Sequence, residues 1–289
     1  MKLELSSTES VYSKQLSSES PLVSIVIPTF NSGRHLARCL ESIAAQSCGF
    51  IETLVIDNYS QDGTDVVAKS YPVRFIRFQG SAAAARNIGI KKSKGRFILL
   101  LDADQALQEG FIKHCIDVLS CSPIDGLIVP EVSVGSGFWT RVLGFEKNLV
   151  SNDVSAAIPR FFRADVLVEL GEDENLVFGE DWDLYMRFRR RGFTAEGVGA
   201  YLLHYESGSL IRILVKSLQY GLSFRRLARK RGAAIYRRYT FLPVSRRRFA
   251  RCFIDDPPHG AGFILLRFLR GVFFGIGVSV SFVTGKKGD

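Results

Sequence analysis

Short runs of aliphatic residues alternate with amphipathic segments over the first third of the chain, and this alternation constrains the fold more than any other feature. The runs have the length and β-branched content of buried strands, and the segments between them carry apolar residues at helical spacing. Such alternation is typical of mostly parallel sheets covered by helices on both faces. We therefore predict a Rossmann-like α/β domain with strands at residues 23–28, 52–56, 73–78 and 97–101 and helices at residues 34–46, 62–70 and 82–92.

The pattern weakens after Pro130. Residues 131–155 contain glycine, serine and a tryptophan, which predicts a loop or lid. A strand is expected at residues 156–162, and a helix with a basic carboxyl-terminal end at residues 181–191. We expect three parts: a disordered tail at residues 1–20, the α/β domain at residues 21–207, and a basic and apolar helical extension at residues 208–289.

Acidic residues stand where two of the predicted strands end. Asp57 follows the second strand and Asp102 follows the fourth. Ligands of parallel sheets bind beyond the carboxyl ends of the strands, where an aliphatic core would favour no acid. The triplet Asp102, Ala103 and Asp104 places two carboxylates near one point, which suits Mg²⁺ or Mn²⁺ holding a diphosphate. The alternative is that the two acids only cap the next helix.

Two further acidic motifs point to the same edge. A carboxylate at Asp57 suits the imide N–H of uracil or the ring N–H of guanine, while Asp62 in the same turn suits a helix N-cap. Glu180 and Asp181 stand at the start of a predicted helix. The helix dipole alone would explain them, but a carboxylate there also suits a general base for an acceptor hydroxyl.

In this order the motifs resemble those of the family 2 glycosyltransferases, which have the GT-A fold. The resemblance runs from residue 21 to residue 209. It rests on residues 23–31, residues 56–58 with 62–64, residues 85–89, residues 102–104, and residues 179–181 with Arg187. Two departures stand out: Asn58 occupies the place of a usual second acid, and the loop at residues 79–84 lacks the usual Asn-Gly start.

The resemblance implies an inverting, metal-dependent transferase. Asp104 would be the more direct ligand of Mg²⁺ or Mn²⁺, with Asp102 beside it, and Asp181 would be the catalytic base. His204 resembles the family's histidine near the metal or diphosphate, or is simply a satisfied edge histidine. The nucleotide sugar would contact Pro28, Thr29, Asn31, Asp57, Arg86, Asp102, Ala103, Asp104 and Glu180, with Asp57 at the base and Arg86 near the diphosphate.

These roles predict a UDP- or GDP-linked sugar donor and a glycan or lipid-linked acceptor. A single displacement would invert the anomeric carbon while Asp181 takes the proton of the acceptor hydroxyl. One alternative is a polyprenyl-phosphate sugar transferase, whose anionic acceptor needs less help from a base. A nucleotidyltransferase lacks support because no glycine-rich phosphate loop follows the first strand. A non-catalytic membrane or nucleic-acid scaffold is disfavoured by the intact acids.

Charge is concentrated late in the chain. The formal net charge is +9, and residues 207–254 hold 13 Lys and Arg with no acidic residue. Interleaved aromatic residues fit an anionic membrane surface, and no nucleic-acid-binding motif accompanies them. The first twenty residues lack an apolar signal-peptide core, and the five cysteines lack a CxxC pair. We therefore expect reduced thiols and a peripheral enzyme on the cytoplasmic face of the membrane, without a nucleic-acid partner.

The segment at residues 260–283 is predicted to be a helix lying in the membrane interface. Its longest charge-free run, residues 271–285, has 15 residues, short of the roughly 20 needed to span a bilayer. The alternative is a helix packed on the protein's own core. In the interfacial reading Arg267, Arg270, Gly277 and Ser281 form a polar stripe, and Phe263, Leu266, Phe273 and Phe274 enter the membrane.

Overall fold

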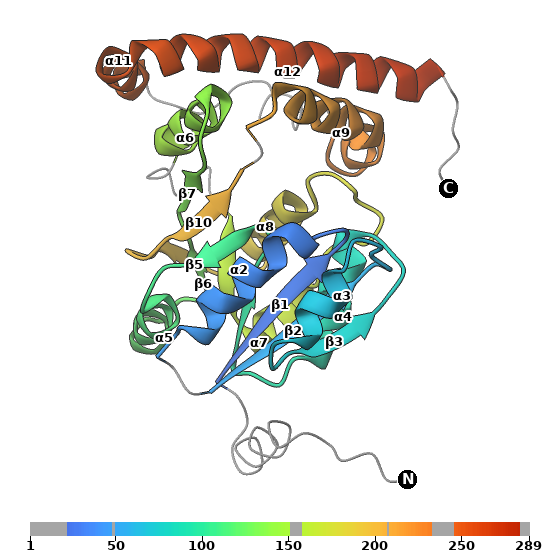
Figure 1. Cartoon of the computed structure of the whole chain (residues 1–289), viewed down its shortest axis with the longest axis vertical. Coiled ribbons are helices and arrows are strands. Elements are labelled where there is room, and N and C mark those ends of the chain that lie inside the picture. The colour runs from blue at the N-terminus through green and yellow to red at the C-terminus, as the bar shows by residue number, and fades with distance from the viewer. Residues whose placement is uncertain (1–21, 48–49, 151–157, 207, 233–245, 284–289) are drawn as a thin grey trace.

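The computed structural model describes residues 22–47, 50–150, 158–206, 208–232 and 246–283. In this part of the chain the larger sheet has seven strands in the order β3-β2-β1-β4-β8-β6-β9 (Figure 1). The parallel strands are β1 (Val23–Thr29), β2 (Ile51–Asp57), β3 (Arg74–Arg77) and β4 (Phe97–Leu100). The mostly parallel, Rossmann-like sheet predicted from the alternation is thereby confirmed.

An antiparallel strand is inserted beside β4. Strand β8 (Pro159–Arg163) pairs antiparallel with β4 and with β6 (Gly126–Ile128), and β9 (Ala195–Gly197) runs parallel to β6. The register between β8 and β4 places Phe161 opposite Leu99, close to the end of β4. Residues of β8 are therefore carried to the edge at which Asp102 lies.

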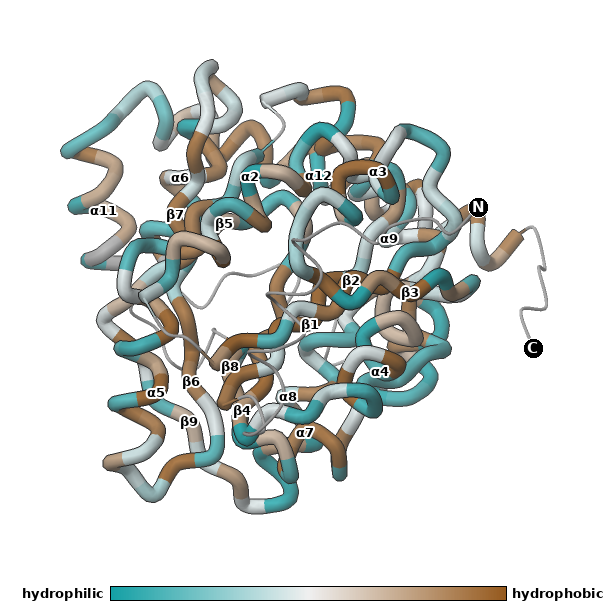
Figure 2. Tube along the Cα trace, turned by 60° about the horizontal axis from the view of Figure 1, so that its bottom comes forward, coloured by the Kyte–Doolittle hydropathy of each residue, from teal (hydrophilic) through white to brown (hydrophobic). Residues whose placement is uncertain are grey.

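Helices cover both faces of the larger sheet because successive strand residues point to opposite sides. Ile25 and Ile27 of β1 belong to one buried cluster, and Val26 belongs to another. The first face is covered by α2 (Gly33–Ala44), α3 (Thr64–Lys69) and α5 (Phe111–Cys121). The second is covered by α4 (Ala82–Lys92), α7 (Ala164–Leu170) and α8 (Glu180–Arg190). In Figure 2 the hydrophobic colour follows β1, β2 and β8 through the middle of the molecule.

A three-stranded sheet lies beyond the carboxyl edge of the larger one. Its order is β5-β10-β7, from β5 (Gln105–Leu107), β10 (Leu202–Tyr205) and β7 (Glu131–Val134). Strand β10 is antiparallel to β5, and His204 is opposite Gln105. The amide of Tyr205 donates to the carbonyl of Asp104 at 2.9 Å. This pairing fixes the acidic triplet against the strand that carries His204.

The prediction of a loop at residues 131–155 is wrong for the part of this segment that the structure describes. Strand β7 and helix α6 (Phe138–Val150) occupy it. The helix buries Val142, Phe145 and Leu149 against residues of the last helix. The partner that makes this segment helical thus lies more than a hundred positions later, where local composition cannot reveal it.

The C-terminal helices form a layer over the small sheet. They are α9 (Leu210–Arg231), α11 (Arg246–Asp255) and α12 (Pro257–Val283), with α12 lying across the end of the molecule above α6 and α9 (Figure 1). Helices α9 and α12 meet at Gly221 and Gly277. A Cβ at Gly221 would lie 2.1 Å from the carbonyl oxygen of Phe274, so the two backbones touch.

The orientation expected for α12 requires correction. Arg267 and Arg270 pair with Glu146 of α6, at 3.3 and 2.8 Å, and so turn toward the protein. Phe263 and Leu266 are buried against α6 rather than available to lipid. The polar stripe is therefore the packed side of the helix. By length and composition alone the 27-residue helix is also long enough to cross a bilayer, contrary to the expectation from its shorter charge-free run.

Part of the basic segment also faces inward. Lys230 and Arg231, at the end of α9, both contact the fully buried carboxylate of Asp183 on α8. Lys230 pairs with Asp173 as well. These contacts fix the end of α9 to the α/β domain, so these two cations are not available to a membrane. Residues 233–245, which include other predicted basic positions, lie outside the described residues.

Candidate active site

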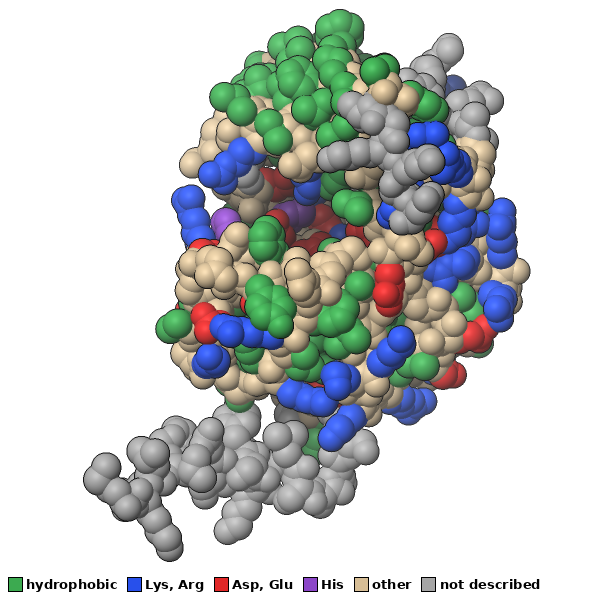
Figure 3. Space-filling view, turned by 90° about the vertical axis from the view of Figure 1, so that its right-hand side faces the viewer, with side chains coloured by type: hydrophobic (Ala, Val, Ile, Leu, Met, Phe, Trp, Pro, Cys, Tyr) green, Lys and Arg blue, Asp and Glu red, His purple; other side chains and the backbone are tan. Residues whose placement is uncertain are grey.

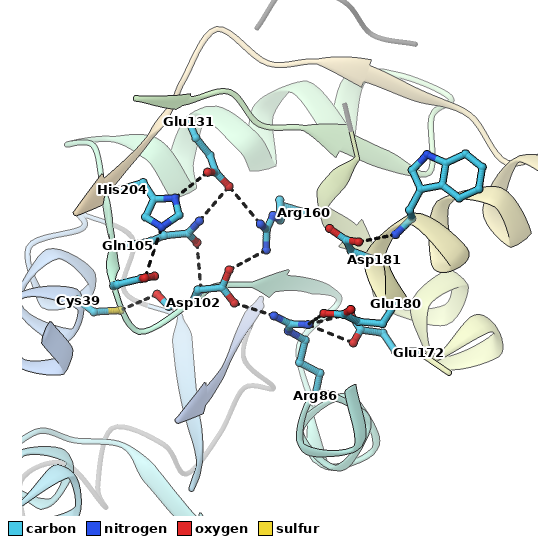
Figure 4. Close-up of polar contacts among 12 residues, drawn as sticks. Cys39, Arg86, Asp102, Gln105, Glu131, Arg160, Glu172, Glu180, Asp181 and His204 are labelled. Carbon is cyan, nitrogen blue, oxygen red and sulfur yellow. Dashed lines mark hydrogen bonds and ion pairs between the residues drawn. The ribbon is translucent and has the colours of Figure 1, made fainter. Parts of the chain in front are cut away.

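The polar groups at the carboxyl edge form two adjoining regions. The first surrounds Asp57 at the end of β2. The second surrounds Asp102 just after the end of β4 (Figure 4). Strand β1 lies between β2 and β4 in the sheet, which places both regions on the same edge. We call them the Asp57 pocket and the Asp102 centre.

The Asp57 pocket is held by neutral donors. The carboxylate of Asp57 is fully buried and accepts the hydroxyls of Thr29 and Ser60 at 2.9 and 2.6 Å. It also accepts the Ser60 amide at 3.0 Å. Asn31 binds the same turn, since its amide donates to the Ser60 hydroxyl at 2.8 Å. Pro28, at the end of β1, is half-buried, so all four predicted nucleotide-side residues gather here.

Two exposed aromatic residues border this pocket and were missed from the sequence. Phe30 and Tyr59 expose 62% and 51% of their surface although they adjoin buried strand ends. Asn31 and Tyr59 have positive φ angles of 49° and 53°, a left-handed conformation uncommon outside glycine. Large exposed apolar rings on a strained turn provide surfaces on which a flat base can stack.

The Asp102 centre is organised by two arginines. Arg86 of α4 reaches Asp102 Oδ1 at 2.7 Å, and Arg160 of β8 reaches Oδ2 at 3.2 Å (Figure 4). Burial would raise the pKa of Asp102, but Arg160 and Arg86 outweigh it and hold that pKa well below its usual range. Both carboxylate oxygens are thus already paired with cations. The role of Asp102 as a metal ligand stays a prediction, and a metal there would have to displace an arginine.

Arg86 also binds acids from the loop before α8 and from α8 itself. Its Nη1 lies 3.2 Å from Glu172 and 3.4 Å from Glu180. Burial alone would lower the pKa of Arg86, yet Glu172, Asp102 and Glu180 raise it further above its usual value. Its buried Nε has no hydrogen-bond partner among the described residues. A buried donor left in this way suits an oxygen of a bound diphosphate.

Glu180 and Asp181 open α8 behind a left-handed Gly179, whose φ is 74°. Asp181 Oδ1 accepts the amide of Trp182 at 2.6 Å, which orients the carboxylate at the helix start (Figure 4). Burial, reinforced by the negative charge of Asp181, raises the pKa of Glu180 well above its usual range. The first turn of α8 therefore holds two neighbouring carboxyl groups, Glu180 and Asp181, at the Asp102 centre.

His204 connects Asp104 to a second cluster of charges. Its Nε2 lies 3.4 Å from Asp104 Oδ2, and its Nδ1 lies 2.9 Å from Glu131 Oε2. Burial lowers the pKa of His204, but Asp104 and Glu131 raise it more, to about 9. The protonated ring therefore donates from Nδ1 to Glu131. Lys147 Nζ lies 2.7 Å from the same nitrogen. It forms ion pairs with Glu131 and Glu206 at 2.9 and 2.8 Å.

The fit of these residues to a divalent cation can be tested from their chemistry. Among the described residues, no group of three or more His, Cys, Asp or Glu side chains could hold a metal ion. Asp104 and His204, whose Oδ2 and Nε2 lie 3.4 Å apart, would still offer one carboxylate oxygen and, once the ring loses its proton from Nε2, one imidazole nitrogen. Such a pair suits Mn²⁺ or Mg²⁺ when diphosphate oxygens and water complete the shell. Glu131 would orient the histidine from behind.

The structure brings most predicted residues together and adds others. Ala103, between the two acids of the triplet, is buried. Sequence reasoning missed several charged contributors: Arg160, Glu131, Glu172, Lys147 and, on α9, Lys216. The signal available for Glu131 was its place directly after Pro130, and for Arg160 a charge inside an apolar strand. Lys216 lies on the site side, where Tyr220 first, and then Asp104 and Asp102, raise its pKa.

Comparison with known proteins agrees with this geometry. Residues 24–165 match the sequence profile of the family described as Glycosyl transferase family 2. Residues 24–165 are therefore a glycosyltransferase family 2 domain. Two curated relatives show how far the similarity extends. The chain is 27% identical over 197 residues to "Glycosyltransferase AglE" of Haloferax volcanii, covering 62% of this chain and 65% of that protein. It is 27% identical over 179 residues to "Minor teichoic acid biosynthesis protein GgaB" of Bacillus subtilis, covering 55% of this chain but 20% of that protein. The chain thus matches less than two thirds of the length of either relative.

Solved structures share the GT-A fold. A mannosyltransferase from Pyrobaculum calidifontis, solved with GDP-Man and Mn²⁺, aligns with a TM-score of 0.63 at 14% identity, over 96% of this chain and 94% of that one. Residues 1–349 of TarS from S. aureus, in complex with UDP-GlcNAc, align with a TM-score of 0.54 at 15% identity, over 91% of each chain. At these identities the likeness concerns the fold alone.

Proposed function

We propose that this chain is an inverting glycosyltransferase that moves a sugar from a UDP- or GDP-linked donor to an acceptor hydroxyl of a glycan or lipid-linked precursor. The observation that carries the proposal is the joining of two unlike regions on one sheet edge. The Asp57 pocket offers a carboxylate and exposed aromatic rings for a nucleoside. The Asp102 centre offers cations and carboxylates for a diphosphate and for proton transfer.

The donor side is supported by both regions. Asp57 lies among hydroxyl donors, and the exposed rings of Phe30 and Tyr59, which adjoin the same strand ends, give surfaces on which a base would stack. The Nε of Arg86, which has no hydrogen-bond partner in the part of the chain that the structure describes, is proposed to donate to the diphosphate. The structural neighbours named above were solved with UDP-GlcNAc and GDP-Man, which is why both nucleotides are proposed as donors.

Asp104 and His204 are the residues that would hold Mg²⁺ or Mn²⁺, with Asp102 close by. A bound divalent cation would neutralise charge that builds on the leaving diphosphate. The chain's own residues perform related work: Arg86 and Arg160 hold Asp102 in place, and Glu131 holds the histidine ring. That the P. calidifontis neighbour was solved with Mn²⁺ supports the choice of metal.

Asp181 is proposed as the base. Its carboxylate takes the proton as the acceptor oxygen forms a bond to C1 of the sugar, and the bond from C1 to the diphosphate breaks on the opposite face. The electron pair of that bond leaves with the nucleoside diphosphate, so one displacement inverts the anomeric centre. Glu180, whose pKa is raised by burial, stays beside it as a contact for the nucleotide sugar.

The enzyme is also proposed to work at the cytoplasmic face of a membrane. The apolar helix α12 supports this placement, as do relatives named for teichoic acid and succinoglycan biosynthesis.

Thermal-shift measurements with UDP-, GDP- and dTDP-sugars, each with and without Mn²⁺, test the donor and metal together. A ligand present at about 100 times its Kd stabilises the protein by about 2.7 kcal/mol, so the true donor class will stand out. Asp104→Asn serves as the matched variant and should lose the added shift that Mn²⁺ gives. If no nucleotide sugar raises the melting temperature, or if turnover persists in EDTA, the donor or the metal assignment is refuted.

A further inference from the structure

Helix α12 has one side packed on the protein and one side left apolar and exposed. The packed side includes Phe263 and Leu266 against α6 and Phe274 against Phe178 and Phe224, with ring centroids 5.8 and 5.2 Å apart. At Gly277 a Cβ would meet the carbonyl oxygen of α9 residue Leu218 at 2.3 Å. These contacts run along most of the helix, which is therefore fixed to the layer beneath it.

The opposite side carries a continuous hydrophobic stripe. Ile264, Phe268, Val272, Ile276 and Val280 recur every four residues and are all exposed, Phe268 by 67%. Residues four apart share a helix face. The charged residues of the helix, Arg267 and Arg270, are turned away and paired with Glu146. Figure 3 shows hydrophobic side chains gathered over this end of the molecule.

The borders of the stripe are basic. Arg225 of α9 lies over the ring of Phe282, with its Cζ 5.3 Å from the centroid. At the other end, Arg247 and Arg251 on α11 are exposed and so is Ile254. Asp255 is also exposed at the turn into α12, so the border is positive but not uniformly so. Cations beside an apolar stripe match the head groups and acyl chains of an anionic leaflet.

We propose that the exposed face of α12, flanked by Arg225, Arg247 and Arg251, docks flat on an anionic phospholipid leaflet, with the helix axis in the membrane plane. The proposal rests on the proposed membrane placement and specifies its surface and orientation. Spanning would require α12 to give up its contacts with both α6 and α9. A second copy of the chain fits this face less well, because two facing copies would bring these arginines together and their positive charges would repel.

This orientation places the site directly under the leaflet. The stripe is one helix layer above α9, and the next layer down contains Phe178, whose ring stacks on Tyr220 at 4.5 Å just before Glu180 and Asp181. Packed helices lie about 8–10 Å apart. Below the hydrophobic end, Figure 3 shows a hollow in which acidic and histidine side chains are visible. An acceptor anchored in the leaflet would reach this hollow from the side.

Vesicle flotation tests the docking face with the full-length protein. Binding to phosphatidylcholine vesicles that contain phosphatidylglycerol is expected to fall roughly a hundredfold in the double variant Phe268→Glu with Ile276→Glu, because two apolar side chains no longer enter the interface. Val66→Glu, an equally exposed apolar site on α3, is the matched control and should bind as the wild type does. Equal binding by the double variant and the control would overturn the proposal.

Depth measurement separates lying flat from spanning. Tryptophan placed at Leu265 or at Ile276, which lie on the same exposed side of the helix and about 16 Å apart along it, should be quenched to the same shallow depth by brominated lipids. Unequal depths would overturn the in-plane orientation. Analytical ultracentrifugation without lipid should show a monomer, and a dimer lost in the double variant would assign the face to a second copy.

The result is separable from the proposed transfer reaction. The double variant should keep the nucleotide affinity of the wild type, measured by calorimetry. Loss of vesicle binding with nucleotide affinity intact supports docking through this face. Wild-type protein that binds nucleotide sugar but floats with no vesicle overturns the docking alone, whereas vesicle binding without any nucleotide affinity refutes the transferase.

Discussion

The Asp57 pocket and the Asp102 centre adjoin on one sheet edge but are stabilised in different ways. Asp57 is buried among neutral donors and forms no ion pair among the described residues. Asp102 is held by two arginines, which in turn bind Glu172, Glu180 and Glu131. In the first region, both oxygens of the buried carboxylate accept hydrogen bonds from Thr29 and Ser60. The second has its charges paired with each other, so an arriving diphosphate must exchange partners with carboxylates.

We propose that the Asp57 pocket recognises the nucleotide and that the Asp102 centre carries out the chemistry. Buried ion pairs cost desolvation and add little net stability, but removing one partner leaves an uncompensated charge. A hydrogen bond from a neutral donor to a buried carboxylate contributes less free energy, and its loss affects fewer neighbouring groups. Substitutions in the two regions should therefore differ in size and in kind.

The largest effect is expected from Asp181→Asn. Without a base, kcat should fall by about 10²- to 10⁴-fold, because proton transfer is needed only in the transition state. Nucleotide affinity, which we propose to be set by the Asp57 pocket, should stay near that of the wild type. Steady-state kinetics paired with calorimetry of UDP and GDP binding checks this. A parallel loss of nucleotide affinity would erase the division between the regions, and near-normal turnover would indicate an anionic acceptor.

Arg86→Met should destabilise the fold by about 3–5 kcal/mol, since Glu172 and Asp102 would lose their shared cation. Urea unfolding followed by circular dichroism measures this. Arg189→Met is the matched control, because Arg189 is an exposed arginine on α8. If the two variants unfold at the same urea concentration, the arginine network contributes no more than an exposed charge.

Glu131→Gln should weaken Mn²⁺ binding by about 10- to 100-fold, because carboxylates behind a liganding histidine typically contribute that much. Calorimetry with Mn²⁺ in the presence of nucleoside diphosphate provides the measurement. The folded state should persist, since Gln can still accept from Nδ1 of His204. Unchanged Mn²⁺ affinity would show that the histidine is not oriented through Glu131.

His204→Gln should lower stability in a pH-dependent way when metal is removed with EDTA. The pKa of His204 is raised from 6.5 to about 9 in the folded protein. Its ion pairs with Asp104 and Glu131 therefore contribute fully below about pH 6.5 and are lost as the pH rises through about 9. Melting temperatures of wild type and variant, compared between these limits, should converge at the alkaline end. A constant gap would assign the loss to packing instead.

The smallest effect is expected in the Asp57 pocket. Thr29→Val removes one hydroxyl donor to Asp57, while Ser60 keeps its two hydrogen bonds, so a loss of about 1.5 kcal/mol is expected. The same urea experiment used for Arg86 gives the comparison. A loss as large as that of Arg86→Met would mean that the two regions do not differ in how they are stabilised.

The sequence located those parts of the site that are written in contiguous motifs. Asp57, Asp102 and Asp181 each follow a strand or begin a helix, so local pattern was enough to predict them. Arg160 and Glu131 could not be found in this way, because only the antiparallel insertion of β8 and the small sheet bring them to Asp102 and His204. The packed face of α12 was misassigned for a similar reason, since its partner Glu146 lies on a helix taken for a loop.

The roles of the individual site residues stay predictions, whereas the α/β architecture is confirmed. Strand and helix periodicity is a local property, so it can be recognised in a single sequence. Charge pairing across elements is a property of the folded register and has no counterpart in local spacing. For this chain, the polar residues that sequence reasoning overlooked are those that neutralise the ones it found.

The bare contact between Gly221 and Gly277 has a mechanical consequence. Where two helices touch through their backbones, no side chain can bend to absorb a displacement. A displacement of α12 should therefore move α9 with it. Tyr220, the residue before Gly221 on α9, stacks on Phe178, which precedes Glu180 and Asp181 by two and three residues. A single methyl group added at Gly221 or Gly277 would force α9 and α12 apart, and would change how these helices lie over the site without altering any residue of the site itself.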